Sequence, residues 1–120
     1  MKVSNNFSSE EFRCRCGNCE HSQGFVPPVG LLMALEDIRY FTQAVVTITS
    51  GIRCKDHNHN IGGSKYSKHL EGIAADIQIA SMTPQDVFSY MESRNYADLL
   101  GLGSYNTFTH IDVRGSKARW

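Results

Sequence analysis

The sequence has no long apolar run. Nowhere does it approach the roughly 18 consecutive apolar residues that a membrane-spanning helix requires. Residues 1–12 also lack the apolar stretch of a secretory signal peptide. We therefore expect no membrane partner. The chain should stay in the cytoplasm of the producing cell or leave it by a route that needs no signal peptide.

An excess of charge of either sign is also missing. Lys and Arg together number 12, and Asp and Glu together number 12, so the formal net charge at pH 7 is +0. Proteins that bind nucleic acids through phosphate attraction usually carry a basic excess. The balance argues against a nucleic-acid partner, and we expect any ligand to be recognised by a local site.

Cysteine is scarce, with only Cys14, Cys16, Cys19 and Cys54. Four cysteines are too few to build a domain of this length from disulfides alone. The close spacing of the first three is compatible with a structural zinc ion held together with Cys54 in a reducing compartment. The alternative is one disulfide from the N-terminal cluster to Cys54, with two free thiols. Both interpretations stay open.

The 120 residues, of which 41% are hydrophobic, suffice for one domain with one core. Its N-terminal segment, residues 1–26, is polar and contains three of the cysteines, and we expect it to pack on the rest. Residues 8–12 predict a short helical turn. Leu31, Leu35 and Ile38 recur at helical spacing, and Thr83 with Pro84 opens a second helix that reaches about residue 94.

Two segments have the character of strands. Residues 44–49 are rich in β-branched side chains, and residues 73–79 alternate between apolar and polar positions. A last strand is expected at residues 109–113, after a break at Gly101-Leu102-Gly103, and residues 50–67 read as a loop. The order predicts a small α+β domain with a mostly antiparallel sheet flanked by helices.

Polar side chains interrupt two of these strands. Asp76 lies within residues 73–79, and His110 and Asp112 share one face of the last strand. A buried carboxylate is costly unless it is paired or bound to a cation. With His69 at the end of the preceding loop, the chain offers two imidazoles and a carboxylate. Such a set suits zinc and leaves a fourth position for water.

The residues around this set resemble a known family. Ser67-x-His69-x-x-Gly72-x-Ala74-x-Asp76 is similar to the signature of zinc D-alanyl-D-alanine carboxypeptidases and murein endopeptidases. These share a fold with VanX-type dipeptidases and the hedgehog signalling domain. Thr49-Ser50-Gly51-Ile52-Arg53 resembles the family's Thr-Ser-Gly-x-Arg segment, and residues 102–112 resemble its last block, especially in the short phage and bacterial branch. The resemblance extends from about Ser8 to the end of the chain.

The resemblance implies roles for individual residues. His69, Asp76 and His110 would be the ligands of one catalytic zinc ion. Arg53 would hold the substrate carbonyl or carboxylate and stabilise an oxyanion, a task suited to its fixed charge and forked donors. Ser67 would form a hydrogen bond within the site or contact the substrate backbone.

The general base departs from the family pattern. Many relatives carry an acid three positions before the last ligand or a histidine two positions before it, where this chain has Thr107 and Phe108. Asp112 is the substitute we expect, either as the base or as a partner that orients His110. Glu71 is the reserve candidate for the base.

The resemblance implies a monomeric zinc peptidase that hydrolyses stem or cross-link peptides of peptidoglycan, as a carboxypeptidase or an endopeptidase. A phage lysin, acting on the cell wall after release, is one setting for such a chain. The missing family base leaves an alternative, which is a zinc-binding module of a phage particle that binds peptides with little or no activity.

Overall fold

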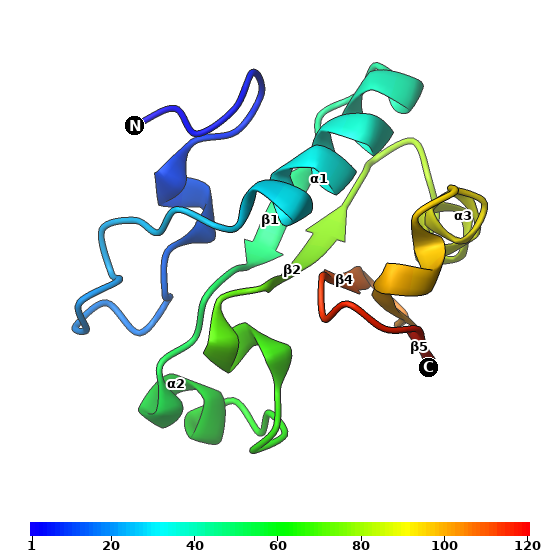
Figure 1. Cartoon of the computed structure of the whole chain (residues 1–120). Coiled ribbons are helices and arrows are strands. Elements are labelled where there is room, and N and C mark those ends of the chain that lie inside the picture. Colours follow the sequence, from blue (N-terminus) through cyan, green and yellow to red (C-terminus); the bar gives the residue numbers. More distant parts are fainter.

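A five-stranded sheet lies at the centre of the computed structural model, which describes all 120 residues (Figure 1). The strand order is β1 (Thr47–Ser50), β2 (Ala74–Gln78), β4 (Thr109–Asp112), β3 (Gly101–Ser104) and β5 (Ala118–Arg119). Every neighbouring pair is antiparallel except β3 and β5, which are parallel. With three α-helices, this confirms the predicted α+β class.

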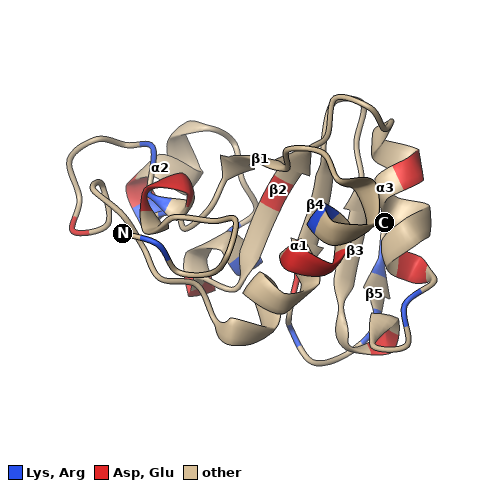
Figure 2. Cartoon of the chain, turned by 90° about the horizontal axis from the view of Figure 1, so that it is seen from above, with Lys and Arg blue, Asp and Glu red and all other residues tan.

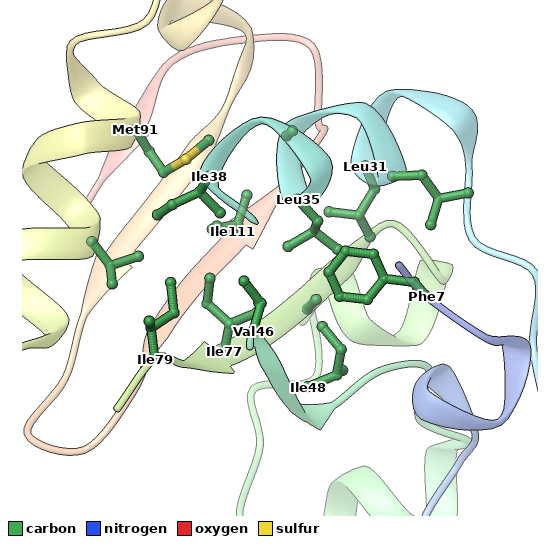
Figure 3. Packing of buried hydrophobic residues seen from close by; sticks show 14 of the residues in the cluster. Phe7, Leu31, Leu35, Ile38, Val46, Ile48, Ile77, Ile79, Met91 and Ile111 are labelled. Carbon is green, nitrogen blue, oxygen red and sulfur yellow. The ribbon is translucent and has the colours of Figure 1, made fainter. Parts of the chain in front are cut away.

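Helices α1 (Val29–Thr42) and α3 (Pro84–Glu92) enclose the core with the sheet, whereas α2 (Lys55–Asn60) lies away from both (Figure 1). Figure 3 shows Leu31, Leu35 and Ile38 of α1 directed toward the apolar side chains of the sheet. The cluster contains 17 buried residues. The helical spacing of the α1 residues places them on one face, and burying that face stabilises the helix.

Both long helices are bounded by local signals. The Thr83 side chain accepts a hydrogen bond from the Asp86 N–H, and the Asp86 side chain reaches back to the Thr83 N–H, so α3 begins with a capping box around Pro84. α1 ends at Gln43, whose left-handed backbone (φ 54°) lets its N–H bond to the Arg39 carbonyl. The prediction of these two helices is confirmed.

Two sequence-based expectations were wrong in detail. The strand expected at residues 44–49 begins only at Thr47, and the expected loop at residues 50–67 contains α2. Cys54 caps α2 by accepting a hydrogen bond from the His57 N–H. The helix has only six residues and no apolar periodicity, so the pattern of hydrophobic side chains gave no sign of it.

The glycines expected to break the chain at residues 101–103 instead form β3. A Cβ atom at Gly101 would collide with the Asp112 carboxylate, and one at Gly103 would collide with the Trp120 indole. Glycine is therefore needed at these two positions because side chains from β4 and from the C-terminal residues pass close to the β3 backbone. The glycines do not mark a turn.

The N-terminal segment has two different parts. Phe7 and Phe12 are 1% exposed and join the core, and Ser8 and Glu11 form a capping box around the expected short 3₁₀ helix, Ser9–Phe12. Residues 13–28, in contrast, form neither helix nor strand. Of these residues, only Cys14 and Pro27 are buried.

Charged residues are spread over the helices and loops at both ends of the molecule, with both signs present at each end (Figure 2). This distribution agrees with the zero net charge. None of the helices has the length and apolar character needed to span a membrane.

Candidate metal centre

The sheet brings two of the expected ligands face to face. Asp76 of β2 lies directly opposite His110 of β4 in their antiparallel register. His69 comes from the short 3₁₀ helix Lys68–Glu71, where the Ser67 hydroxyl accepts a hydrogen bond from the His69 N–H at 3.2 Å. Gly72 ends that turn in a left-handed conformation (φ 74°), which a glycine adopts without strain.

The three side chains converge on one point. His69 Nε2 and His110 Nδ1 each lie 3.1 Å from Asp76 Oδ1, and all three residues are buried. Tetrahedral zinc has ligand bonds of about 2.0–2.2 Å to nitrogen and oxygen, which separates neighbouring ligand atoms by about 3.3 Å. The donor set and its spacing therefore fit a zinc ion with one position left open.

Each imidazole is oriented from its far side. His69 Nδ1 lies 2.7 Å from the Gly51 carbonyl oxygen, and His110 Nε2 lies 2.7 Å from Asp112 Oδ2. When these nitrogens donate to the oxygens, the opposite nitrogens keep their lone pairs directed at the centre. Metal-binding histidines are usually held in this manner.

Asp112 lies behind the site and not within it. Its side chain is completely buried, and Arg114 donates to both carboxylate oxygens, through Nε at 2.8 Å and Nη2 at 2.7 Å. Burial raises the pKa of Asp112, but the hydrogen bonds from Arg114 and His110 outweigh it and hold the pKa well below its ordinary range. The side chain is a fixed anion behind His110.

The electrostatics of the centre favour a bound cation. Burial raises the pKa of Asp76, but hydrogen bonds from His110 and His69 bring it to about 2. Burial likewise lowers the pKa of His110, yet its bonds to Asp112 and Asp76 leave that pKa above the ordinary value. Two buried anions thus surround the imidazole, and a divalent ion can compensate them in place of a proton.

Arg53 is fixed beside the centre by three contacts. Nη2 pairs with Asp76 Oδ2 at 3.2 Å, Nε donates to Ser50 Oγ at 3.0 Å, and Nη1 donates to Asn58 Oδ1 at 3.2 Å. A guanidinium has five N–H donors, so two of them stay available to a ligand. Asn58 of α2 is 3% exposed and was not foreseen, because the sequence around it reads as a loop.

The centre opens into a pocket of about 590 Å³. The predicted site residues Arg53, Ser67, His69, Asp76 and His110 all line it. Its remaining charged and aromatic lining is Lys68, Arg114, Tyr66, Tyr105, Phe108 and Trp120. Asp76 is the only acidic side chain in this lining. The three cationic side chains, Arg53, Lys68 and Arg114, are each paired with an acid, namely Asp76, Glu71 and Asp112.

The reserve base candidate lies outside the pocket. Glu71 pairs with Lys68 at 2.9 Å on the surface, and its side chain is 54% exposed.

Two of the aromatic side chains that line the pocket are joined by a hydrogen bond of 2.6 Å, from Trp120 Nε1 to the Tyr105 hydroxyl oxygen. Trp120 also packs beside the His110 ring, with 5.0 Å between ring centroids.

The cysteines form a second, separate cluster. The four sulfur atoms lie within 4.8 Å of one another, and no two of them are joined in a disulfide. The cluster is linked covalently to the pocket, because Cys54 directly follows Arg53, which lines that pocket.

Comparisons with known proteins give a consistent result. The sequence model of the peptidase M15 family matches residues 5–112 of this chain. A zinc D-Ala-D-Ala carboxypeptidase from Streptomyces albus G is 28% identical over 75 residues, which cover 62% of this chain and 29% of that protein. The chain thus matches less than a third of the length of this curated relative.

Proposed function

The chain belongs to the peptidase M15 family, and we propose that it is a zinc-dependent peptidase that cleaves stem or cross-link peptides of peptidoglycan. The observation that carries this proposal is the convergence of His69, Asp76 and His110 at the floor of one pocket, with Arg53 beside them. The name of the relative, a zinc D-Ala-D-Ala carboxypeptidase, supports peptides that end in D-Ala-D-Ala as the substrate class.

In this proposal His69 Nε2, Asp76 Oδ1 and His110 Nδ1 hold the zinc ion. When bound there, zinc would polarise a peptide carbonyl and lower the pKa of a water molecule toward neutrality. The Gly51 carbonyl and Asp112 keep the two imidazoles in the required orientation. Ser67 acts by fixing the turn that carries His69.

The cations of the pocket would bind the substrate. Arg53 has two N–H donors left for a carbonyl oxygen or a carboxylate. Lys68 and Arg114 also line this pocket, where Glu71 and Asp112 already balance their charges. A peptide with a free terminal carboxylate next to the scissile bond can bind to the donors of Arg53 through its charge, so it should bind more tightly than a neutral peptide. This difference favours carboxypeptidase action.

The proposed hydrolysis also needs a group that accepts and returns a proton. Asp112 is buried and engaged by Arg114, so we propose that it positions His110 and does not act as the base. The oxygen of Tyr105 accepts a hydrogen bond from Trp120, which leaves the O–H of Tyr105 able to donate into the pocket.

The lack of a free carboxylate in the pocket favours a second candidate function, a zinc-dependent peptide-binding module without activity.

Incubation with a synthetic stem peptide ending in D-Ala-D-Ala tests the proposal. The zinc-loaded protein should release D-Ala, detected by mass spectrometry, and Asp76→Ala should reduce the release to background because one ligand is lost. Asp98→Asn, which changes a side chain that is 86% exposed, serves as the control. Binding of the peptide without release would establish the second candidate. A wild-type protein that binds no zinc at its His–Asp–His centre would overturn both.

A further inference from the structure

The cysteine cluster joins two distant parts of the chain. Cys14, Cys16 and Cys19 belong to the irregular part of the N-terminal segment, whereas Cys54 precedes α2. Cys14 and Cys54 are 40 residues apart, yet the Cys54 N–H donates to Cys14 Sγ at 3.4 Å. The proposed peptidase reaction uses none of the four sulfur atoms.

The cysteine-containing part has no regular secondary structure and little buried surface. Residues 13–28 contain no helix or strand, and they bury only Cys14 and Pro27. An irregular segment of this length in a compact domain is uncommon and needs another source of order. Small or core-poor regions commonly obtain it from disulfides or a bound metal.

The local backbone is arranged around sulfur. The Asn18 N–H donates to Cys16 Sγ, and the His57 N–H donates to Cys54 Sγ, each at 3.4 Å. Gly17 has a left-handed backbone (φ 79°), which allows the tight turn that carries Cys16 and Cys19 to the same cluster. Amide donors of this kind favour the thiolate, which is the form that binds metal.

The number and spacing of the sulfur atoms distinguish a metal from a disulfide. A disulfide would use two sulfur atoms and leave two thiols beside it. Four sulfur atoms that all lie within 4.8 Å of one another suit tetrahedral zinc, whose bonds of about 2.3 Å place sulfur atoms about 3.8 Å apart. Zinc with four thiolates carries two negative charges, and Arg13, Arg15 and Arg53, which adjoin Cys14 and Cys54 in the sequence, can offset them.

We propose that Cys14, Cys16, Cys19 and Cys54 bind a second, structural zinc ion. This ion would tie the irregular segment to the start of α2. Because Cys54 follows Arg53 and α2 carries Asn58, the same ion would hold in place both Arg53 and the side chain that orients it. The site does not depend on the proposed peptidase activity, since its ligands are separate from the His–Asp–His group.

Zinc content per chain, measured by mass spectrometry on the full chain, tests the proposal. The wild type should hold two equivalents, and Asp76→Ala and Cys16→Ser should hold one each. Asn18→Ala alters the same turn without removing a sulfur ligand, and it should keep both. An Asp76→Ala protein without zinc would overturn the structural site, whereas a wild type that loses nothing on Asp76→Ala would overturn the catalytic ligands.

Two further measurements do not depend on the folding of a cysteine variant. Cobalt-loaded Asp76→Ala should show the charge-transfer absorption of thiolate-bound Co²⁺, because its only remaining site has sulfur ligands. Alkylation of the wild type after denaturation with a chelator and without reductant should label all four cysteines. A count of two labels would reveal a disulfide and overturn the proposal. Iron in place of zinc in the measured metal content would overturn it as well.

Discussion

At the scale of single residues, the burial of Asp112 bears on which role this carboxylate has. The sequence left two roles open, general base or partner of His110. In the structure its oxygens contact His110 and Arg114, and it does not line the pocket. A carboxylate in that position can orient the imidazole and raise its basicity, which supports our proposal that Asp112 positions His110.

The substitution Asp112→Asn distinguishes the two roles. Loss of the orienting anion should weaken zinc binding about 10–100-fold, as measured by competition with a chromophoric chelator. At saturating zinc, D-Ala release should return to within an order of magnitude of the wild type. Activity that stays at background with the centre fully loaded would instead identify Asp112 as the base. Asp98→Asn provides the matched exposed control.

The resemblance to the family predicted which side chains meet in the pocket, but it missed a residue that supports one of them. Arg53, Ser67, His69, Asp76 and His110 were all expected to share one site, and they line one pocket. Asn58 was missed, because its contact with Arg53 depends on α2. No spacing rule signals a six-residue helix made of charged and polar side chains. That no other carboxylate lines the pocket also became visible only in three dimensions.

At the scale of elements, α1 and the end of α3 are joined through one carboxylate. Tyr90 donates to Asp37 Oδ1 at 2.8 Å, Arg94 donates to Oδ2 at 2.7 Å, and the Tyr96 hydroxyl also donates to Oδ2. Burial raises the pKa of Asp37, but the bonds from Tyr96, Tyr90 and Arg94 outweigh it and leave that pKa below its ordinary value. The contact therefore stabilises the fold only while Asp37 is ionised.

The substitution Asp37→Asn tests this linkage and its dependence on pH. At pH 7 it should lower the free energy of unfolding by about 1–3 kcal/mol, since hydrogen bonds to a charged acceptor are lost. Because the folded pKa lies below the unfolded value of about 3.9, the stabilisation is complete above that value and disappears as the pH falls through the folded pKa. Urea unfolding across this range should show the two proteins converging in acid. Glu20→Gln, at an 84% exposed side chain, should show no such convergence.

The elements themselves differed in how far the sequence revealed them. α1 carries apolar residues at helical spacing, α3 begins with a capping threonine and a proline, and β2 alternates, so all three were expected. β3 and β5 were not, because β3 is half glycine and β5 has only two residues. Trp120 and Asp112 lie so close to the β3 backbone that a Cβ atom at Gly101 or Gly103 would collide with them. These are tertiary contacts, and the local pattern of residues along the sequence does not reveal them.

At the scale of the whole molecule, the N-terminal segment contributes to the same core as the sheet. Phe7 and Phe12 are 1% exposed and belong to the cluster that includes α1 and the central strands. Figure 3 shows Phe7 among these side chains. Gly51, which precedes the Arg53 loop, lies so close to the Phe12 backbone that a side chain there would collide. These contacts support our proposal that residues 1–120 form one domain.

The substitution Phe12→Ala measures this contribution. Removing a fully buried ring should lower the free energy of unfolding by about 3–5 kcal/mol, a large share of the about 5–15 kcal/mol typical of a domain. Thermal unfolding followed by circular dichroism should remain a single transition with a lower midpoint. Phe41→Ala removes the same ring from a 59% exposed position and should cost far less. Equal losses, or two separate transitions, would contradict the single-domain proposal.

The register of β2 against β4 also has a consequence for the order of folding. Asp76 and His110 lie opposite each other although 34 residues separate them in the chain. The ligand set therefore does not exist until this long-range pairing has closed, a slow step compared with local helix formation. Nascent or partly unfolded molecules would therefore lack the assembled ligand set. The proposed activity would be confined to molecules in which β2 and β4 have paired.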